Sequence, residues 1–309
     1  MEHSDALVGR SGTIVEISPC RLPWVIAMRR AVHLGAWTIF CDIAGQVSES
    51  PDNPIVTVAA VGVAREVLRQ IRGRLVRSFN GTPTKWKRGG LSGAARIAAL
   101  TVAYRLPTAV AQCHRSTEKW SRFYTQATKF RSKARMDLDK PLGYLDGNEV
   151  MRMYLMGQGF SQLVGRLLKD RHPWGDRRAT LDLEVVIDTD MHEAETRQQF
   201  KEALQEWAVK SRLHEELEVE PSITCEVQTE QEEPLLLFPD YIAGIYQHAD
   251  PRARLGHPVA SPDDASRLVQ ELRLRLGSRL YENPEDFAQE YPLDHDGERV
   301  TRRGQRNDC

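Results

Sequence analysis

The sequence has no apolar run close to the roughly 20 residues that a helix needs to cross a bilayer. Its N-terminus also lacks the charged and then apolar pattern of a secretory signal peptide. The 5 cysteines stand far apart and form no C-x-x-C pair, which argues against a zinc ribbon and against a disulfide framework. These absences predict a soluble protein of the reducing cytoplasm with no membrane partner.

Several common catalytic motifs are absent as well. The chain has no G-x-G-x-x-G or G-x-x-x-x-G-K-[ST] loop, so neither type of phosphate-binding loop is indicated. The zinc-binding H-E-x-x-H pattern and the G-x-S-x-G nucleophile elbow are missing too. Any chemistry must therefore come from side chains that are distant in the sequence.

The net charge of −1 conceals a strong asymmetry along the chain. Residues 64–140 carry 18 Lys and Arg against 4 Asp and Glu, whereas residues 180–300 carry 11 against 28. A basic half attracts polyanions such as nucleic acid, and a carboxylate-rich half holds cations. Mutual neutralisation of the two halves, within the fold or between subunits, is the alternative explanation.

Short apolar segments predict a mixed β-sheet. Residues 36–43 and 55–63 flank a polar, proline-containing turn, which indicates a hairpin. Further strands are expected at 107–113, 181–187 and 222–227, and helices at 64–79, 91–104, 117–133, 148–169, 193–210, 239–248 and 265–280. A hairpin followed by strand–helix units predicts an α/β fold with helices on both faces of the sheet. We expect an N-terminal extension (1–35), a main domain (36–250), and a C-terminal helix with a polar tail (251–309).

Three carboxylates lie at junctions between expected elements and have apolar neighbours. Asp42 and Asp188 each end an expected strand, and Asp240 lies in the first turn of an expected helix. Strand ends in such sheets meet at one edge, and converging carboxylates need a cation, for which oxygen ligands favour Mg²⁺ or Mn²⁺. Singly, each has a simpler explanation: Asp42 and Asp188 as turn formers, and Asp240 as a residue that complements the helix dipole.

A basic loop is the candidate nucleic-acid contact. Lys85, Trp86, Lys87 and Arg88 combine three cations with an aromatic ring between glycine-containing segments, a composition able to contact phosphates and to stack on a base. The alternative is a solvated turn with Trp86 folded onto the core. Residues 120–135, which also mix cations with aromatic side chains, allow the same two interpretations.

Three segments resemble motifs of a known family, and they follow one another along the chain in the same order as in that family. Residues 41–45 (CDIAG) resemble a strand end that reads Asp-Glu-Ser-Gly in the family, and residues 236–244 (LLFPDYIAG) resemble its closing helix, Leu-Gln-Leu-Ala-Asp-Leu-Ile-Ala-Gly. Residues 185–188 (VVID) resemble its middle strand with a terminal Asp. The family is a large, uncharacterised bacterial group of ribonuclease H-like proteins, and the resemblance covers roughly residues 36–250.

The resemblance and the three carboxylates together give two hypotheses. The first is a metal-dependent nuclease or phosphodiester-processing enzyme in which Asp42, Asp188 and Asp240 bind Mg²⁺ or Mn²⁺ and the basic region holds nucleic acid. Ile43 and Ala44 replace the family's Glu and Ser. This departure motivates the second hypothesis, a catalytically degenerate binding or assembly module, in a mobile-element or phage-defence system, with a protein partner or as a homo-oligomer.

A third possibility is an unrelated α/β protein whose acidic residues lie apart. It is favoured if the three carboxylates are more than about 10 Å from one another, beyond the reach of a shared two-ion site.

Overall fold

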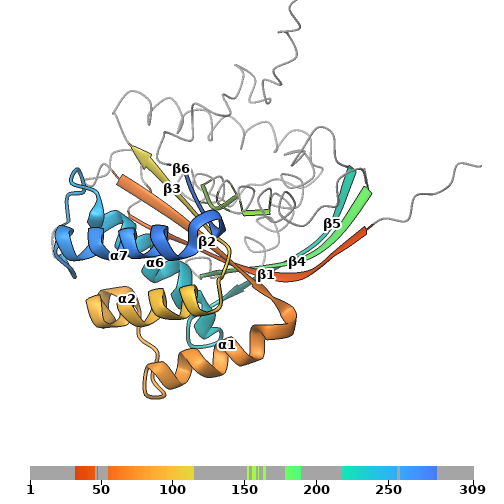
Figure 1. Cartoon of the computed structure of the whole chain (residues 1–309), viewed down its shortest axis with the longest axis horizontal. Coiled ribbons are helices and arrows are strands. Elements are labelled where there is room, and N and C mark those ends of the chain that lie inside the picture. The colour runs from red at the N-terminus through yellow and green to blue at the C-terminus, as the bar shows by residue number, and fades with distance from the viewer. Residues whose placement is uncertain are drawn as a thin grey trace, which may run out of the picture. The chain divides into compact units, whose positions relative to one another are not determined.

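A computed structural model describes residues 32–45, 47, 55–114, 178–188, 218–255 and 258–283, with some positions between 152 and 164 (Figure 1). By their contacts, residues 1–30 and 31–309 separate into two units, and the first lies outside the described residues. The expected helices at 117–133 and 193–210, and with them the basic segment 120–135, also lie outside the described residues.

The described part is organised around a six-stranded sheet with the order β5-β4-β1-β2-β3-β6. Its strands are β1 (Val32–Ala44), β2 (Ile55–Ala64), β3 (Thr108–His114), β4 (Arg178–Asp188), β5 (Glu218–Gln228) and β6 (Leu280–Asn283). β2 pairs antiparallel with β1 and β3, whereas the pairs β1–β4, β4–β5 and β3–β6 are parallel. A mixed sheet with this order of its first five strands is ribonuclease H-like.

Four helices cover one face of the sheet: α1 (Arg65–Ser78), α2 (Trp86–Ala103), α6 (Leu237–Ala249) and α7 (Pro262–Leu276). A short 3-10 turn, η1 (Pro234–Leu236), leads into α6. α6 packs against β1 and β2 as well as against α2 and α7, which explains why nearly all of its side chains are buried. It is therefore the central helix of this layer.

The opposite face of the sheet is covered too. Ala59 and Val61 of β2 belong to the core shared with α6, so the alternate residues Val58 and Ala60 point the other way. There they meet Gly159, at which an added Cβ would lie 2.8 Å from a methyl carbon of Val58. Gly159 is a helical position. The expected α/β sheet with helices on both faces is thus confirmed.

Two elements differ from the sequence-based expectation. The basic loop, expected between helices at 64–79 and 91–104, already becomes helical at Trp86, and the helix is interrupted at Gly90, where φ is 55°. Only a glycine takes this backbone conformation without strain. Part of the polar tail expected within residues 251–309 instead forms β6, whose Glu282 accepts a hydrogen bond from Arg273 of α7 at 2.8 Å. Both differences depend on tertiary contacts that no local pattern encodes.

α7 packs into the same core as the preceding elements, and β6 pairs with β3 in the same sheet. Both elements follow residue 250, where we expected the main domain to end. None of the helices that the structure describes is both long and apolar enough to span a membrane.

Candidate active site

Parallel pairing of β1 with β4 brings two of the three predicted carboxylates to the same edge of the sheet. The last paired residues of the two strands are Cys41 and Ile187, and Asp42 and Asp188 follow them directly. Neighbouring strands lie about 4.8 Å apart, so these two residues are adjacent. The sequence-based interpretation of both strand ends therefore places them correctly relative to each other.

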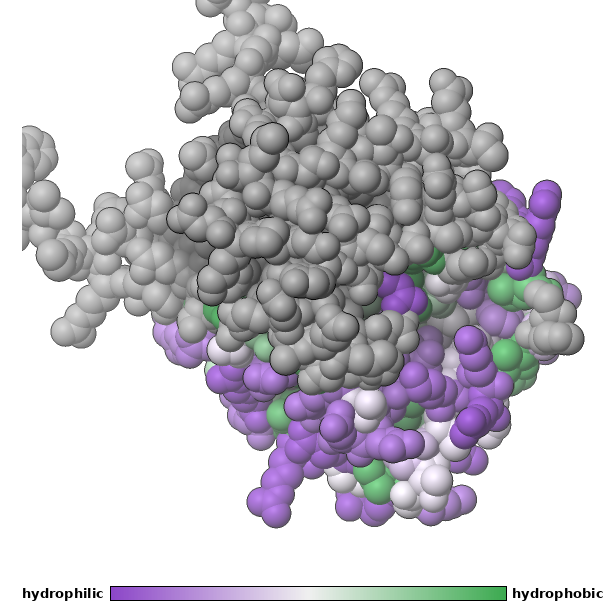
Figure 2. Space-filling view, turned by 180° about the vertical axis from the view of Figure 1, so that it is seen from behind, coloured by the Kyte–Doolittle hydropathy of each residue, from purple (hydrophilic) through white to green (hydrophobic). Residues whose placement is uncertain are grey.

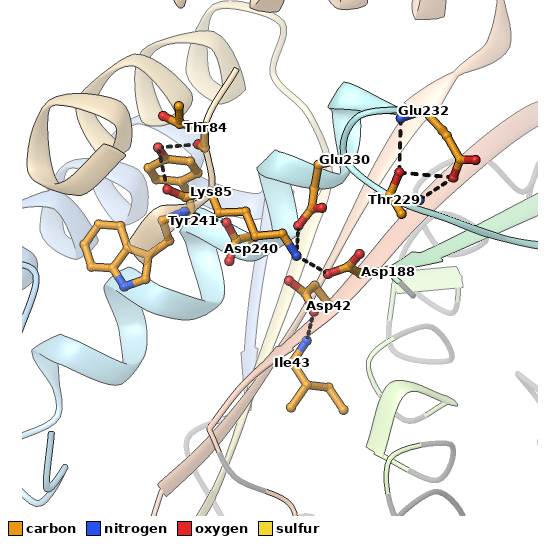
Figure 3. Close-up of polar contacts among 11 residues, drawn as sticks. Asp42, Ile43, Thr84, Lys85, Asp188, Thr229, Glu230, Glu232, Asp240 and Tyr241 are labelled. Atoms are coloured by element: carbon orange, nitrogen blue, oxygen red, sulfur yellow. Dashed lines mark hydrogen bonds and ion pairs between the residues drawn. The ribbon is translucent and has the colours of Figure 1, made fainter. Parts of the chain in front are cut away.

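Both side chains point to the face that carries α6. Phe40 and Val186 belong to the core on that face, and Asp42 and Asp188 follow them by two residues, the repeat of a strand. The first turn of α6 brings Asp240 to the same place (Figure 3). Negative charge on Asp240 and on Asp188 acts on Asp42 strongly enough to raise its pKa. The three carboxylates thus form one cluster rather than three separate sites.

Asp42 and Asp240 are held by backbone N–H groups. One carboxylate oxygen of Asp42 accepts from the N–H of Ile43 at 2.6 Å, and Oδ2 of Asp240 accepts from the N–H of Trp86 at 2.7 Å. Burial nevertheless raises the pKa of Asp42 well above its usual value, and the charges of Asp240 and Asp188 add to the effect. Burial likewise raises the pKa of Asp240 to about 6, against the opposing effect of the Trp86 N–H.

A fourth carboxylate, Glu230, belongs to the same cluster and was missed by the sequence analysis. It lies in the turn that follows β5, the parallel neighbour of β4, so it emerges at the same sheet edge as Asp188. Its side chain is only 11% exposed and forms an ion pair with Lys85. The sequence did carry a signal, because Glu230 follows a predicted strand just as Asp42 and Asp188 do.

Lys85 is the cation of this cluster. Its Nζ donates to Oδ2 of Asp188 at 2.9 Å and also contacts Glu230 (Figure 3). Burial by itself would lower the pKa of Lys85, but the hydrogen bonds to Glu230 and Asp188 outweigh it and raise that pKa. The side chain thus stays charged at neutral pH and neutralises part of the acidic cluster.

The donor set is suited to a hard divalent cation, since it consists of carboxylate oxygens. Among the described residues, however, no group of three or more acidic, histidine or cysteine side chains is arranged to hold a metal ion. Mg²⁺ is commonly held by only one or two carboxylates, with water and substrate phosphates completing its coordination. The cluster fits that type of site better than an all-protein cage.

The side chains of the basic loop differ in their surroundings. Trp86 is 4% exposed and packs edge-on against Tyr241 and His248, with ring centroids 5.7 and 4.9 Å away. Its ring is therefore part of the core, and the prediction that Trp86 stacks on a base is corrected to the alternative interpretation. Lys87 and Arg88 are exposed. Their contact with nucleic acid stays a prediction.

Close contact between α2 and α6 fixes the loop relative to Asp240. The hydroxyl of Tyr241 donates to the carbonyl oxygen of Thr84 at 2.7 Å. Gly244 leaves the space that Trp86 fills, because an added Cβ there would lie 2.5 Å from the indole. The absence of a side chain at Gly244 thus lets the Trp86 backbone N–H reach the carboxylate of Asp240.

Exposed arginines are spread along α1 and α2. They are Arg65, Arg69, Arg74 and Arg77 on α1 and Arg96 on α2, and we call them the arginine surface. Among them Arg65 lies 3.9 Å from Glu184, and a further arginine of α1, Arg72, pairs with Glu233. The view from behind in Figure 2 shows hydrophilic residues along the lower rim, where Figure 1 places α1. Part of the predicted basic region is thus an open surface.

Comparisons with known proteins give limited similarity. No protein-family model and no curated protein sequence matches the chain. A crystal structure of Bst-RNase HIII in complex with Mn²⁺ aligns with a TM-score of 0.34 and 15% identity, over 72% of this chain and 54% of that one. A glutamine-to-alanine mutant of the same enzyme aligns with a TM-score of 0.33 and 13% identity, over 80% and 66% of the two chains.

The chain therefore spans about half the length of the Mn²⁺-bound enzyme, 54% of it. The ribonuclease H-like fold rests on the order and direction of the strands. Membership of the uncharacterised bacterial family stays a prediction.

Proposed function

We propose that this protein is a metal-dependent nuclease or phosphodiester-processing enzyme acting on nucleic acid. The observation that carries the proposal is the convergence of Asp42, Asp188 and Asp240 on one face and one edge of the sheet. In this proposal the three carboxylates hold Mg²⁺ or Mn²⁺. A bound divalent ion supplies an activated water and stabilises the leaving oxygen of a phosphodiester.

The protein's own side chains have the complementary task of holding the substrate. Lys87 and Arg88 extend from the loop that also carries Lys85, and the arginine surface continues over α1. Phosphate contacts from such side chains fix the position of a nucleic acid without reading its sequence. Binding by these residues predicts an affinity that falls steeply as the salt concentration rises.

Asp42→Asn tests the catalytic proposal. The wild type is expected to cut DNA, RNA or a hybrid in the presence of Mn²⁺, and the variant is expected to lose at least about a hundredfold in rate, as for a lost electrostatic contact in a catalytic site. Asp182→Asn is the matched control, since Asp182 lies on β4 six residues before Asp188 and outside the cluster. A wild type that cuts none of the three substrates contradicts the nuclease proposal.

A binding or assembly module is the second candidate, and two observations favour it. Ile43 occupies the position at which the resembling family has a Glu, and Lys85 already neutralises part of the carboxylate cluster. This candidate predicts that wild type and Asp42→Asn bind nucleic acid with the same affinity and the same salt dependence, and that neither cuts it. Cleavage by the wild type in Mn²⁺ distinguishes the two candidates, and an electrophoretic mobility series at increasing salt tests the binding that both of them predict.

A further inference from the structure

The carboxylate cluster consists of two pairs that are neutralised in different ways. Lys85 contacts Asp188 and Glu230, whereas the described partners of Asp42 and Asp240 are backbone N–H groups. We propose that Lys85 permanently supplies one of the positive charges of the site, so that the cluster takes a single divalent ion, held by Asp42 and Asp240. This inference rests on the proposed function and narrows its metal ligands from the three carboxylates to Asp42 and Asp240, with Asp188 bound to Lys85 instead.

The first pair, Asp188 and Glu230, already has its cation. Their side chains are 15% and 11% exposed, and the ammonium group of Lys85 lies between them. A divalent ion at this position would have to displace that ammonium group or lie against it, with repulsion between like charges at short distance. The pair is therefore closed to a metal while Lys85 stays in place.

The second pair, Asp42 and Asp240, has no described cation in contact with it, and the charge of Lys85 acts on it only from a distance. Of the residues that the structure describes, none forms an ion pair with either carboxylate. Both carboxylates are partly buried on one face and at one edge of the sheet, and like charges gathered in such a setting are the situation that a bound cation relieves. Two carboxylates together balance the charge of one divalent ion, and two such ligands suffice for Mg²⁺ when water completes its coordination.

Lys85 is well suited to a permanent position because its backbone is fixed. Its neighbour Trp86 is buried between Tyr241 and His248, and Trp86 donates its own backbone N–H to Asp240. The residue that orients one carboxylate of the second pair is thus covalently joined to the residue that neutralises the first pair. This connection links both pairs to the start of α2.

The number of Mn²⁺ ions bound per chain tests the inference. Equilibrium dialysis of the purified full chain is expected to give one Mn²⁺ for the wild type and one for Lys85→Arg, which keeps the charge. Lys85→Met removes the charge at similar length and is expected to bind two, since Asp188 and Glu230 then accept the second ion. Lys87→Met is the matched control at an exposed lysine of the same loop, with one ion expected.

Any other number of bound ions contradicts either the role of Lys85 or the proposed function. Two ions in the wild type, or one ion in Lys85→Met, overturns the role of Lys85 and leaves the proposed metal-dependent function standing. No Mn²⁺ bound by any of the four proteins overturns the proposed function itself. If Lys85→Met fails to fold, the wild type and Lys85→Arg still decide, because two ions in either of them contradicts the inference.

Discussion

The two carboxylate pairs of the site lie at the same sheet edge, but their negative charges are compensated in different ways. Asp188 and Glu230 share a side-chain cation, Lys85, whereas Asp42 and Asp240 depend on single backbone N–H groups. Burial raises the pKa of Asp240 to about 6 and also raises that of Asp42, and the charge of Lys85, which acts on both from a distance, does not offset this effect. Backbone dipoles can orient a buried carboxylate, but they do not replace a full opposite charge.

The largest expected effect comes from separating α6 from Trp86, which disrupts the second pair. In Gly244→Ala the new methyl group would lie 2.5 Å from the indole of Trp86 inside the core. We expect a loss of about 2–3 kcal/mol in the free energy of unfolding, the range for overpacking a buried site. Urea denaturation followed by circular dichroism measures this loss.

Gly73→Ala is the matched control, because an added Cβ at this position in α1 meets nothing closer than Arg77 at 3.5 Å. There the same substitution is expected to stabilise the protein, by about 0.5–1 kcal/mol, through the better helix propensity of alanine. Equal effects of the two substitutions would contradict the role of Gly244 in close packing.

The next effect has the opposite sign and concerns Asp240. In metal-free protein its raised pKa means that protonation favours the folded state, fully below the unfolded pKa of about 3.8 and progressively less as the pH rises through about 6. Asp240→Asn keeps an oxygen acceptor for the Trp86 N–H and does not ionise. We expect the variant to be more stable than the wild type by about 2–3 kcal/mol at pH 7, because each of the roughly two pKa units of the shift is worth about 1.4 kcal/mol.

That advantage is expected to be absent near pH 4 and to grow as the pH rises to about 6, the pKa of Asp240. Thermal unfolding in the presence of a chelator, measured across this range, provides the comparison. A variant less stable than the wild type at pH 7 would show that the negative charge of Asp240 is already compensated.

The smallest effect is expected in the first pair. Glu230→Gln removes one partner of Lys85, but the lysine is 51% exposed and keeps Asp188. We expect a loss of only about 0.5–1 kcal/mol, since solvent screens a half-exposed ion pair. Glu226→Gln, at an exposed position of β5, is the control and is expected to leave unfolding unchanged. A loss larger than that of Gly244→Ala would reverse the ranking of the two pairs.

The sequence could indicate those carboxylates that lie beside segments with a clear apolar strand or helix pattern. Asp42 and Asp188 follow apolar strands, and Asp240 begins a helix with a nearly continuous apolar composition, so local periodicity was enough to locate them. Glu230 also follows a predicted strand, and Lys85 belongs to the predicted basic loop, but neither position indicates that the two side chains pair. Their meeting depends on the side-by-side placement of β4 and β5 and on the position of α2, which are set by contacts between distant parts of the chain.

The sequence by itself thus determined an α/β fold with a mixed sheet, and it determined which strand ends carry carboxylates, because strand periodicity and burial are written in neighbouring residues. The tertiary structure decided what neutralises them. It made Lys85 the partner of Asp188 and Glu230, and it buried Trp86 instead of leaving it in a solvated loop. Charge pairing and packing act between side chains that meet only in the folded chain, so composition and spacing cannot fix them.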